Sequence, residues 1–499
     1  MTGTPDRLVH QLLDEALTSH ADAWAVRDQA GRWTYQELAD RSHGYARWLH
    51  SLGVRPGERV LTKLESDRDL VALCYAVSRL GAVFVPVNPA MKLFHLRAVL
   101  ENAEPVVVIT TEKDLAWLPE NVGAPAYDIE LIRPLAEELG GGEPLASPAV
   151  SAQTPAALVY TSGSTATPKA VICPHAQMVF ASEAIQQVLG YREDDVVFCR
   201  FPISWDYGLY KILLSCLGRS ELVLAGVESD LLLLNRMWET GATVVPIVPS
   251  LASMIVKLAE RQPDRLPEVR MFTNTGAALP RGTVEALTAA FPKAQVVRQF
   301  GQTECKRISI VPPGAEHVPP GSVGRPLPGT RVVVLAPDGT ELPTGEVGEI
   351  VVAGPHVMPG YWRMDEQTER AFRPGPDGRR RLHTGDFGRL DAEGNLYFEG
   401  RRDDMFKRKG IRMSTVEIEA AAADVSGVRA AAAVPPGEGY DLTLFVESEL
   451  PPGVILREIA GRLEPAKVPA MCRVLNEMPL TQHGKVDRTG LAAWLRDEG

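Results

Sequence analysis

The 499-residue sequence has little of three features that would place it in a special class of protein. Its formal net charge is −11, which argues against nucleic acid as the main partner, because phosphate binding needs surplus Lys and Arg. It has no apolar run long enough to span a bilayer. Cysteines are few and scattered, without the spacing of a metal site or a disulfide framework: Cys74, Cys173, Cys199, Cys216, Cys305 and Cys472. We expect these thiols to be reduced and mostly buried.

The remaining composition is that of a globular enzyme, with 45% hydrophobic and 23% charged residues. The beginning, MTGTPDRLVHQLLDEAL, is polar and amphipathic rather than a signal peptide. We therefore expect a cytoplasmic protein without a membrane partner. The length favours two or more domains.

Helical patterns alternate with short β-branched runs in the first part of the chain. WTYQELADRSHGYARWLHSLG is helical and stops at Gly53, and VALCYAVSRLGAVFVPVNP predicts a helix, a glycine break and a buried strand. PVVVITT and ATVVPIVPS are further buried strands. This alternation predicts layered α/β structure with mostly parallel sheet.

The pattern changes from Val323 onward. GTRVVVLAPDGTELPTGEVGEIVVAG has period-two runs with turn dipeptides, which predicts an antiparallel β subdomain, and EGN at 393–395 is a hairpin turn. Beyond Asp403 a helix, two strands, a helix and a strand predict a small α+β domain. We place the boundary in the charged stretch 402–404, giving a large domain of residues 1–402 and a small mobile domain of residues 403–499.

The stretch LVYTSGSTATPKAVICPH, residues 158–175, combines hydroxyl side chains, a glycine and a lysine in one loop. The hydroxyl groups can donate hydrogen bonds to an anion, and Gly163 allows backbone N–H groups to turn toward it. Lys169 adds a positive charge. The loop is not a Walker P-loop, because the G-x-x-x-x-G-K-[ST] spacing is absent and AVICPH predicts a strand. A Ser/Thr-rich hairpin turn explains it equally well in isolation.

Four other segments are ambiguous when each is taken alone. QFGQTE (299–304) is an ordinary turn with one carboxylate. LHTGDFGRL puts Asp386 after a glycine, where an exposed carboxylate binds two ribose hydroxyls or forms a plain Asx turn. GRRDDMFKRKGIRMSTVEIE is a charge run of the kind that forms solvated faces, and PLTQHGKVDR ends in a tail lysine.

Together, and in this order, these segments resemble the adenylate-forming enzymes: acyl-CoA synthetases, adenylation domains of nonribosomal peptide synthesis, and luciferases. The resemblance begins at WTYQEL and RLGAVFVPVNPA and covers nearly the whole chain. It implies ATP and Mg²⁺ as cofactors and an AMP-forming ligase as the activity. A catalytically silent nucleotide-binding regulator is the alternative from another class, and retention of Glu304 and Lys485 argues against it.

The resemblance also implies roles for particular residues. The loop from Thr161 to Lys169 would hold the β- and γ-phosphates, Glu304 would bind Mg²⁺, and Lys485 would lie between the substrate carboxylate and the α-phosphate. Catalytic residues implied are Lys485, Thr165 and Glu304. Nucleotide-binding residues implied are Thr161, Ser162, Gly163, Ser164, Lys169, Gly276, Ala277, Phe300, Gly301, Thr303, Asp386, Arg401 and Arg412, and the implied hinge is Asp403.

Three positions depart from the family pattern. Ala166 and Ala170 stand where glycines are usual, and the added methyl groups restrict the phosphate loop. His483 replaces the asparagine before the terminal Gly-Lys. We interpret these departures as tuning.

The segment FPISWDYGLYKILLSCL matches the place where amino-acid-activating members carry an aromatic residue followed by aspartate. Asp206 would hold a substrate ammonium, since a buried unpaired carboxylate is costly; a helix N-cap is the alternative. Arg307 would pair with a polar or anionic substituent, or point to solvent. The implied substrate-binding residues are Trp205, Asp206, Tyr207, Tyr210, Ser250, Thr275, Gln299 and Arg307, with Thr273 and Ile308 beside them.

The sequence thus predicts ATP-dependent activation of a carboxylic acid as acyl-adenylate with release of pyrophosphate. The preferred acid is an amino acid with a polar side group, and the acyl group would pass to the phosphopantetheine thiol of a separate carrier protein. An AMP-forming acyl-CoA synthetase for a non-amino acid is the alternative, with CoA as the acceptor. No carrier domain follows residue 499 in this sequence, so we expect a stand-alone enzyme.

Overall fold

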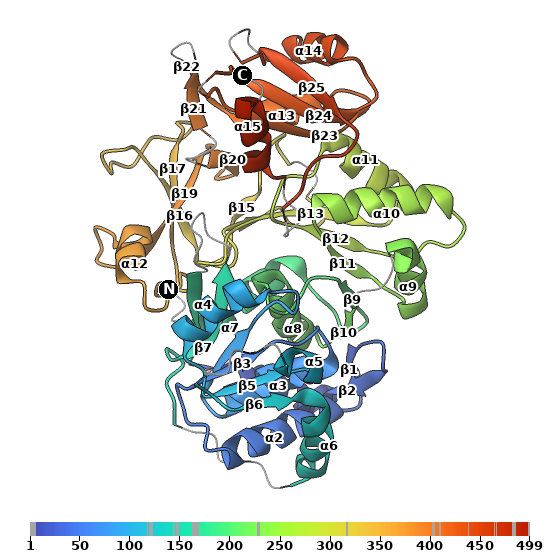
Figure 1. Ribbon diagram of the computed structural model, residues 1–499, viewed down its shortest axis with the longest axis vertical. Coiled ribbons are helices and arrows are strands. Elements are labelled where there is room, and N and C mark those ends of the chain that lie inside the picture. The colour runs from blue at the N-terminus through green and yellow to red at the C-terminus, as the bar shows by residue number, and fades with distance from the viewer. Residues whose placement is uncertain are drawn as a thin grey trace.

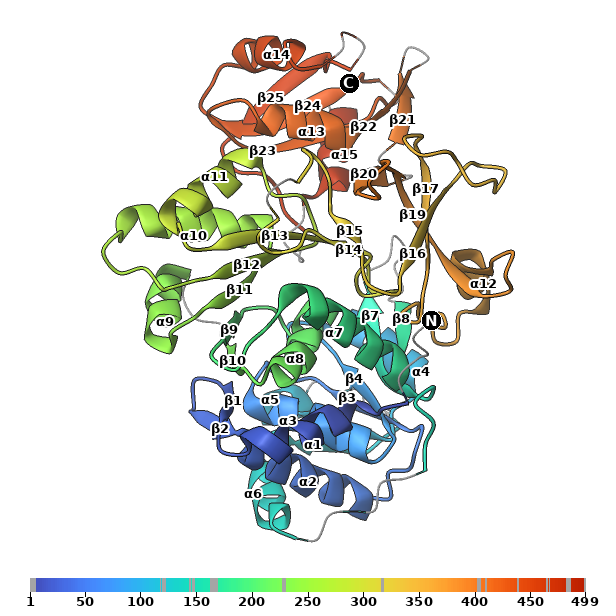
Figure 2. The ribbon, with the colours of Figure 1, turned by 180° about the vertical axis from the view of Figure 1, so that it is seen from behind.

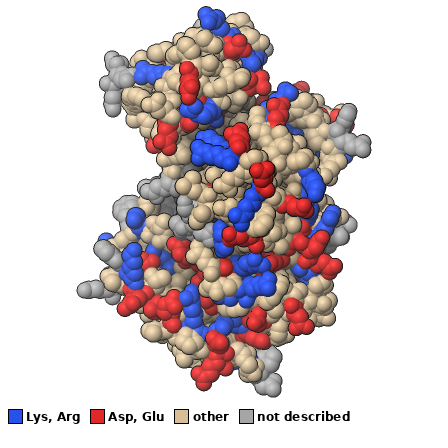
Figure 3. Space-filling model, turned by 90° about the vertical axis from the view of Figure 1, so that its right-hand side faces the viewer, with Lys and Arg blue, Asp and Glu red and all other residues tan. Residues whose placement is uncertain are grey.

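A computed structural model of the chain describes residues 6–116, 118, 123–142, 145, 149–161, 169–226, 230–315, 318–401, 405–408, 411–437, 439–463, 465, 467–481 and 486–497. Figures 1 and 2 show a large lower part and a smaller lobe at the top, which contains the residues after 405. Acidic and basic side chains are intermixed over the face shown in Figure 3. No helix among the described residues is long and apolar enough to cross a membrane.

The first sheet has six strands and is parallel apart from its last pair. Its central strands consist of fully buried β-branched and apolar residues, as a sheet covered on both faces requires. In the order β6-β5-β3-β4-β7-β8 the strands are Ala126–Asp128, Val107–Thr110, Arg59–Thr62, Val83–Pro86, Pro155–Thr161 and Lys169–Pro174.

The second sheet has nine strands, and its strands β12 and β13 contain the predicted Thr273, Gln299 and Phe300. Its order is β15-β14-β13-β12-β11-β9-β10-β1-β2: Arg325–Pro326, Ser309–Ile310, Gln295–Phe300, Met271–Asn274, Val244–Ile247, Val196–Cys199, Glu221–Leu224, Trp24–Arg27 and Arg32–Thr34. The six neighbouring strands β13, β12, β11, β9, β10 and β1 are parallel to one another. At the two edges of the sheet, β2 pairs antiparallel with β1, and β14 pairs antiparallel with β13 and β15.

Helices cover both sheets, and some of them, such as α2, begin at a residue whose side chain caps the helix. Thr34 and Glu37 form a capping box at the start of α2, and Gly53 follows this helix with φ +84°. Helix α7 contacts β8 of the first sheet, while its neighbour α8 contacts β9 and β10 of the second (Figure 1). The helices are α1 Val9–His20, α2 Tyr35–Ser51, α3 Arg68–Arg79, α4 Leu93–Ala103, α5 Glu112–Leu115, α6 Ile129–Gly140, α7 His175–Leu189, α8 Asp206–Gly218, α9 Leu233–Thr240, α10 Pro249–Arg261 and α11 Arg281–Ala290, with a 3₁₀ turn at Asp230–Leu232.

The antiparallel subdomain predicted after Val323 is present. Its five strands are β16 Arg331–Leu335, β17 Gly348–Ala353, β18 Phe372–Pro374, β19 Arg380–Leu390 and β20 Leu396–Arg401, with α12 at Asp365–Ala371. The turn at EGN joins β19 to β20, where Asp391 donates its backbone N–H to Asn395 O.

The C-terminal part contains the predicted helix, strand, strand, helix and strand, with a hairpin before them and a helix after them. The elements are β21 Met405–Arg408, β22 Ile411–Ser414, α13 Thr415–Ala423, β23 Val428–Val434, β24 Thr443–Ser448, α14 Pro452–Ala460, β25 Met471–Leu475 and α15 Arg488–Asp497. This part has apolar clusters of its own, built around residues such as Ile418, Leu444 and Ile455. The expected boundary at residues 402–404 lies outside the described residues and stays a prediction.

The mixed α/β architecture, with a large N-terminal part and a smaller C-terminal one, confirms the expected fold class. All six cysteines are buried and free, as predicted.

Candidate functional site

The predicted phosphate loop connects two antiparallel neighbours, β7 and β8. Its stem is closed by Thr161 and Lys169, which are paired across the two strands, and Thr161 Oγ1 donates to Lys169 O at 3.4 Å. A strand follows the loop, as the sequence predicts, so the arrangement differs from a Walker loop that opens a helix. Residues 162–168, with the predicted Ser162, Gly163, Ser164 and Thr165, lie outside the described residues.

Tyr361 joins the base of this loop to Glu304. Its hydroxyl donates to Glu304 Oε1 at 2.7 Å, and its ring centroid lies 5.6 Å from Lys169 Nζ. The backbone on either side of Tyr361 is bound to β8, because Ile172 N donates to Gly360 O at 3.0 Å and Trp362 N donates to Ala170 O at 2.8 Å. The fold therefore brings one carboxylate and one lysine, which are 135 positions apart in the sequence, to the same tyrosine.

Burial, followed by the charge of Glu304, raises the pKa of Tyr361, so this hydroxyl stays protonated and keeps donating to the carboxylate. The sequence analysis missed Tyr361. The only signal was its place in the aromatic pair of PGYW.

Asp386 and Arg401 meet across the β19–β20 ladder. Arg401 Nε donates to Asp386 Oδ1 at 3.1 Å, and the backbone N–H of Asp386 donates to Thr384 Oγ1 at 3.0 Å. The expectation of an exposed carboxylate at position 386 is wrong: Asp386 is 3% exposed, because β19 lies between β17 and β20. The arginine is largely exposed.

The predicted nucleotide-binding residues Gly276, Ala277 and Phe300 lie at or just after the ends of β12 and β13, which are parallel neighbours. Gly276 has φ +86°, and Asn274 Nδ2 closes the turn by donating to Ala277 O at 2.8 Å. The Phe300 ring lies 5.2 Å from that of Phe398 on β20. Gly301 approaches the next loop so closely that a Cβ there would lie 2.7 Å from Arg307 Cα.

Asp206 is the first residue of α8, and its side chain makes an ion pair that the sequence did not predict. Lys306 Nζ donates to Asp206 Oδ2 at 3.0 Å and to Asp206 O at 2.7 Å. The N-cap alternative for Asp206 is wrong, since Trp205 occupies the cap position and no side chain caps this helix end. The Lys306 side chain is 1% exposed to solvent, and the Asp206 side chain is 24% exposed.

The backbone of Lys306 lies in the left-handed region, with φ +61°, which is uncommon for a lysine and marks a tightly specified turn. Burial lowers the pKa of Lys306 to about 8, and the opposite charge of Asp206 limits the fall.

Arg307 is 3% exposed, so the alternative in which it points to solvent is wrong. Its Nη1 donates to Thr275 Oγ1 at 2.8 Å, whereas its buried Nε has no hydrogen-bond partner among the described residues. The same holds for buried polar atoms of Tyr210, Asn274, Gln299 and Gln302. Buried polar atoms are seldom left unpaired, so this concentration fits a site that binds a polar ligand.

Tyr207 connects the residues predicted to bind the acid to the second sheet. Its hydroxyl donates to Thr273 O at 2.5 Å, and its ring centroid lies 4.8 Å from that of Phe201. The Phe201 ring in turn lies 6.4 Å from that of Trp205. Thr273 and Ile308 are fully buried, whereas Ser250, near the start of α10, is exposed.

Three further predicted residues, besides those of the loop 162–168, fall where the structure gives no side chain. Lys485 and Asp403 lie outside the described residues, and for Arg412 only the backbone, on β22, is described. The two ends of the Lys485 segment are close together, because Leu480 and Val486 form an isolated bridge.

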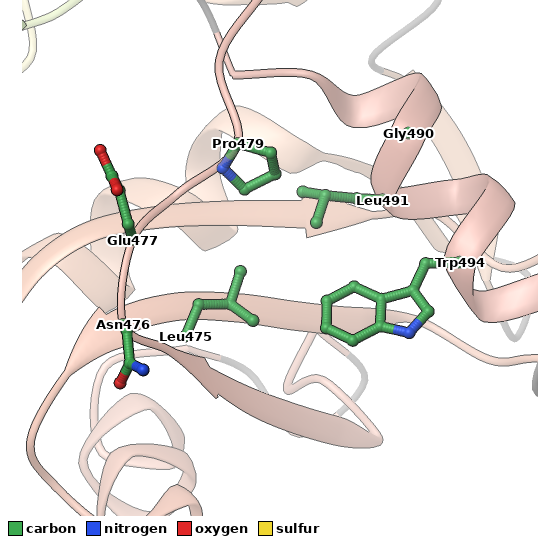
Figure 4. A pocket seen from close by; sticks show the side chains of 7 residues that line it. All are labelled: Leu475, Asn476, Glu477, Pro479, Gly490, Leu491 and Trp494. Atoms are coloured by element: carbon green, nitrogen blue, oxygen red, sulfur yellow. The ribbon is translucent and has the colours of Figure 1, made fainter.

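Figure 4 shows an apolar hollow beside this bridge. Leu475, Pro479, Leu491 and Trp494 face it, while Asn476 and Glu477 point away (Figure 4). It contains none of the predicted site residues.

Comparisons with known proteins identify the class of protein to which this fold belongs. Residues 13–362 match the family described as AMP-binding enzyme, and the chain belongs to this family. It is an AMP-forming ligase that activates a carboxylate with ATP, which confirms the resemblance.

Among curated relatives, novobiocin biosynthesis protein H of Streptomyces niveus is 28% identical over 98% of this chain and 83% of its own length. The dimodular nonribosomal peptide synthase of Bacillus subtilis (strain 168) is 28% identical over 92% of this chain, which spans 20% of that protein. The chain thus spans one fifth of a much longer synthase, whereas it spans 83% of the novobiocin protein.

Two proteins of known structure are similar to this chain. The crystal structure of VinN is 51% identical, with a TM-score of 0.75 over 79% of this chain and 99% of VinN, and VinN has also been solved with L-aspartate and with 3-methylaspartate. ATP-bound MatB from Rhodopseudomonas palustris is 27% identical, with a TM-score of 0.86 over 99% of this chain and 100% of that one.

Proposed function

We propose that the enzyme activates an amino acid with a second carboxylate, such as aspartate, and transfers the acyl group to the phosphopantetheine thiol of a separate carrier protein. The observation that carries this proposal is the group formed by Asp206, Lys306 and Arg307. It places one carboxylate beside two buried cations, so both signs of charge are available to a substrate.

The carboxylate and the two cations of this group can bind the ammonium and the second carboxylate of a zwitterionic acid. An ammonium would bind the Asp206 carboxylate, whose second oxygen, Oδ1, accepts no hydrogen bond from the described residues. Two of the three N–H donors of Lys306 are used on Asp206, which leaves one, and the Arg307 Nε is unpaired among the described residues. These donors would bind the second carboxylate, and charge-assisted bonds of this kind are strong.

The VinN structures support this choice of acid. VinN was solved in complex with L-aspartate and with 3-methylaspartate, and it is 50% and 46% identical to this chain in the respective comparisons. Both compounds are dicarboxylic amino acids.

The proposed reaction places the first carboxylate of the acid against the α-phosphorus of ATP. Both reactants are anions, so catalysis consists of positioning and charge neutralisation. Lys169, with the hydroxyl-rich loop that it ends, would hold the phosphates, Asp386 and Arg401 would hold the ribose, and Lys485 would neutralise the attacked group. Glu304 would hold Mg²⁺, which when bound neutralises phosphate charge. A carboxylate fixed by the Tyr361 hydroxyl fits a hard cation that prefers oxygen ligands.

An acyl-CoA synthetase acting on a dicarboxylic acid without an amine is the second candidate. One observation favours it: Asp206 already has Lys306 as its partner, so the three groups carry one net positive charge that a single carboxylate would balance. The overall similarity to MatB is compatible with it.

ATP–pyrophosphate exchange with L-aspartate, 3-methylaspartate, L-asparagine, succinate and malonate tests the proposal. We expect exchange with the dicarboxylic amino acids, much less with asparagine and with the acids that lack an amine, and AMP as the final nucleotide. Exchange limited to succinate or malonate would replace the proposal by the second candidate. ADP as the product would overturn both. The acceptor is tested by supplying a phosphopantetheinylated carrier protein or free CoA to the enzyme with its acyl-adenylate. The thioester formed is identified by its mass.

A further inference from the structure

Lys211 is buried next to Tyr207, close to the proposed acid-binding group, which consists of Asp206, Lys306 and Arg307. It belongs to α8, one turn after Tyr207, and is 1% exposed. No carboxylate lies within ion-pair distance of it among the described residues, where its one hydrogen bond is to a tyrosine. An unpaired buried charge is costly, and a leucine or methionine would fill the same space more favourably. The lysine therefore calls for a role beyond packing.

Lys211 contacts the acid-binding group through the ring of Tyr207. Its Nζ lies 4.7 Å from that ring centroid, and the same centroid is 5.6 Å from Lys306 Nζ and 5.6 Å from Arg307 Cζ. The face of an aromatic ring attracts cations, so a charge on Lys211 can be held there. Tyr207 is fixed in turn by its hydroxyl bond to Thr273.

The groups around Lys211 carry more positive than negative charge. Lys306, Arg307 and Asp206 act on it from the acid-binding group, and Cys199 and Tyr191 act from β9 and the turn after α7. Burial lowers the pKa of Lys211 well below its usual value, and Lys306 lowers it further; Cys199 and Asp206 oppose this fall, whereas Arg307 adds to it. An anion bound beside Lys306 and Arg307 would favour the charged form of Lys211.

The contact with Tyr191 accommodates both forms of the amine. The Nζ to hydroxyl distance is 3.0 Å. A charged Lys211 donates N–H to the tyrosine oxygen, and a neutral one accepts the tyrosine O–H through its lone pair. Gain of a proton therefore reverses this hydrogen bond without breaking it.

We propose that Lys211 is a positioning residue for the second carboxylate of the substrate: when that carboxylate binds, the Lys211 amine takes one proton from solvent, and the resulting charge acts on the carboxylate across Tyr207. The inference rests on the proposed function, because it needs an acid with a second carboxylate. It does not need the substrate amine.

The test uses Lys211→Met, which keeps an unbranched side chain, one atom shorter, and removes its charge. Selectivity for L-aspartate over L-asparagine in ATP–pyrophosphate exchange should fall roughly tenfold, mainly through a higher KM for aspartate. The wild-type KM for aspartate should rise with pH, because proton uptake becomes harder, and this rise should be smaller in the variant. An unchanged selectivity together with an unchanged pH profile would overturn the inference.

Calorimetry measures the proton directly. Binding of L-aspartate is measured in two buffers of different ionisation enthalpy, and the wild type should take up more protons than Lys211→Met. Equal uptake by the two proteins would also contradict the inference.

Tyr191→Phe is the matched control, since it removes the hydrogen bond and leaves the amine. It should lower thermal stability while keeping the preference for aspartate over asparagine. If it reduced that preference as much as Lys211→Met does, Lys211 would act through packing of Tyr191, and the inference would fail. Lys211→Met should melt at or above the wild-type temperature, because an apolar residue replaces a buried charge.

The outcomes separate this inference from the proposed function. If the wild type activates no acid with a second carboxylate, both fail. If it activates aspartate and Lys211→Met behaves like the wild type, only the role of Lys211 fails. If it prefers succinate or malonate, the same Lys211 experiment is carried out with that acid and its monoamide.

Discussion

At the scale of single residues, the pair formed by Asp206 and Lys306 is central to the proposed recognition of the substrate. Lys306→Met should reduce exchange with L-aspartate by roughly a hundredfold, because removing one member of a buried charge pair leaves the other unpaired and removes a donor for the substrate. The measurement is KM and kcat in the exchange assay. Lys293→Met is the control, since Lys293 lies on the surface and is 80% exposed. Equal activity of the two variants would remove Lys306 from the site.

Tyr361 gives a second prediction at this scale. Tyr361→Phe should raise the Mg²⁺ concentration needed for half-maximal exchange by about tenfold, because the Glu304 carboxylate loses the hydroxyl that orients it. Tyr397→Phe is the matched control: its hydroxyl donates to Asp391 in an exposed turn. A Mg²⁺ requirement that is the same in both variants would show that Tyr361 does not act through a metal at Glu304.

The sequence predicted residues whose motif is local and missed those defined by distant contacts. Asp206 and Arg307 were predicted because the resemblance places each in the region where substrate-binding residues are expected. Lys306, Lys211 and Tyr361 were missed, since lysines are usually exposed and nothing local signals their burial. Only the fold brings Lys306 to Asp206, 100 positions away.

At the scale of elements, α1 is held to the core by neutral histidines. Val9 N donates to His175 Nδ1 at 3.1 Å, and His10 Nδ1 lies 3.0 Å from Ser78 Oγ. Burial lowers the pKa of His175 to about 3 and that of His10 to about 4. The unfolded chain therefore binds more protons than the folded one below about pH 6.5.

This difference predicts stability that is complete above about pH 6.5 and is lost as pH falls toward 4. Each histidine contributes up to about 1.4 kcal/mol per pH unit. The melting temperature should thus fall steeply over this interval. His175→Asn keeps an acceptor for Val9 and removes the titrating ring, so its melting temperature should change less with pH. A wild-type melting temperature that is constant from pH 7 to pH 5 would contradict this account.

Ala170, one of the three departures from the family pattern, lies in β8, the strand after the predicted phosphate loop. Ala170 is fully buried in β8, and its carbonyl accepts from Trp362 N. Ala170→Gly should cost about 1 kcal/mol of stability, since it removes a buried methyl group and loosens a strand. The KM for ATP should change little, because Ala170 lies in the strand and not in the loop. A large change in this KM would assign Ala170 to phosphate binding instead.

Strands and hairpins were predictable from the sequence because burial and turn chemistry are local signals. The β21–β22 hairpin was missed, since its charged sequence favours a solvated face. The burial of Asp386 was missed for another reason: a strand of eleven residues places it in the middle of a sheet, while the sequence GDFG suggests a turn.

At the scale of the whole molecule, the small C-terminal part carries Lys485 and has apolar clusters of its own. Lys485→Ala should reduce pyrophosphate exchange by roughly two to four powers of ten, and yet it should allow transfer from a pre-formed aminoacyl-adenylate to a thiol. The expectation follows if this part approaches the site with Lys485 only for adenylation. Equal loss of both half-reactions would point to misfolding or to a different role for Lys485.

The central claim is that Asp206 recognises an ammonium while Lys306 and Arg307 recognise a second carboxylate, and one set of measurements tests it most directly. Exchange is measured for the wild type, Asp206→Asn and Arg307→Leu, each with L-aspartate, L-asparagine and succinate. The account predicts that Asp206→Asn loses at least roughly a hundredfold with aspartate and far less with succinate, while Arg307→Leu shifts preference toward asparagine. A wild type that activates succinate as well as aspartate, with equal losses for all three acids in both variants, would contradict it.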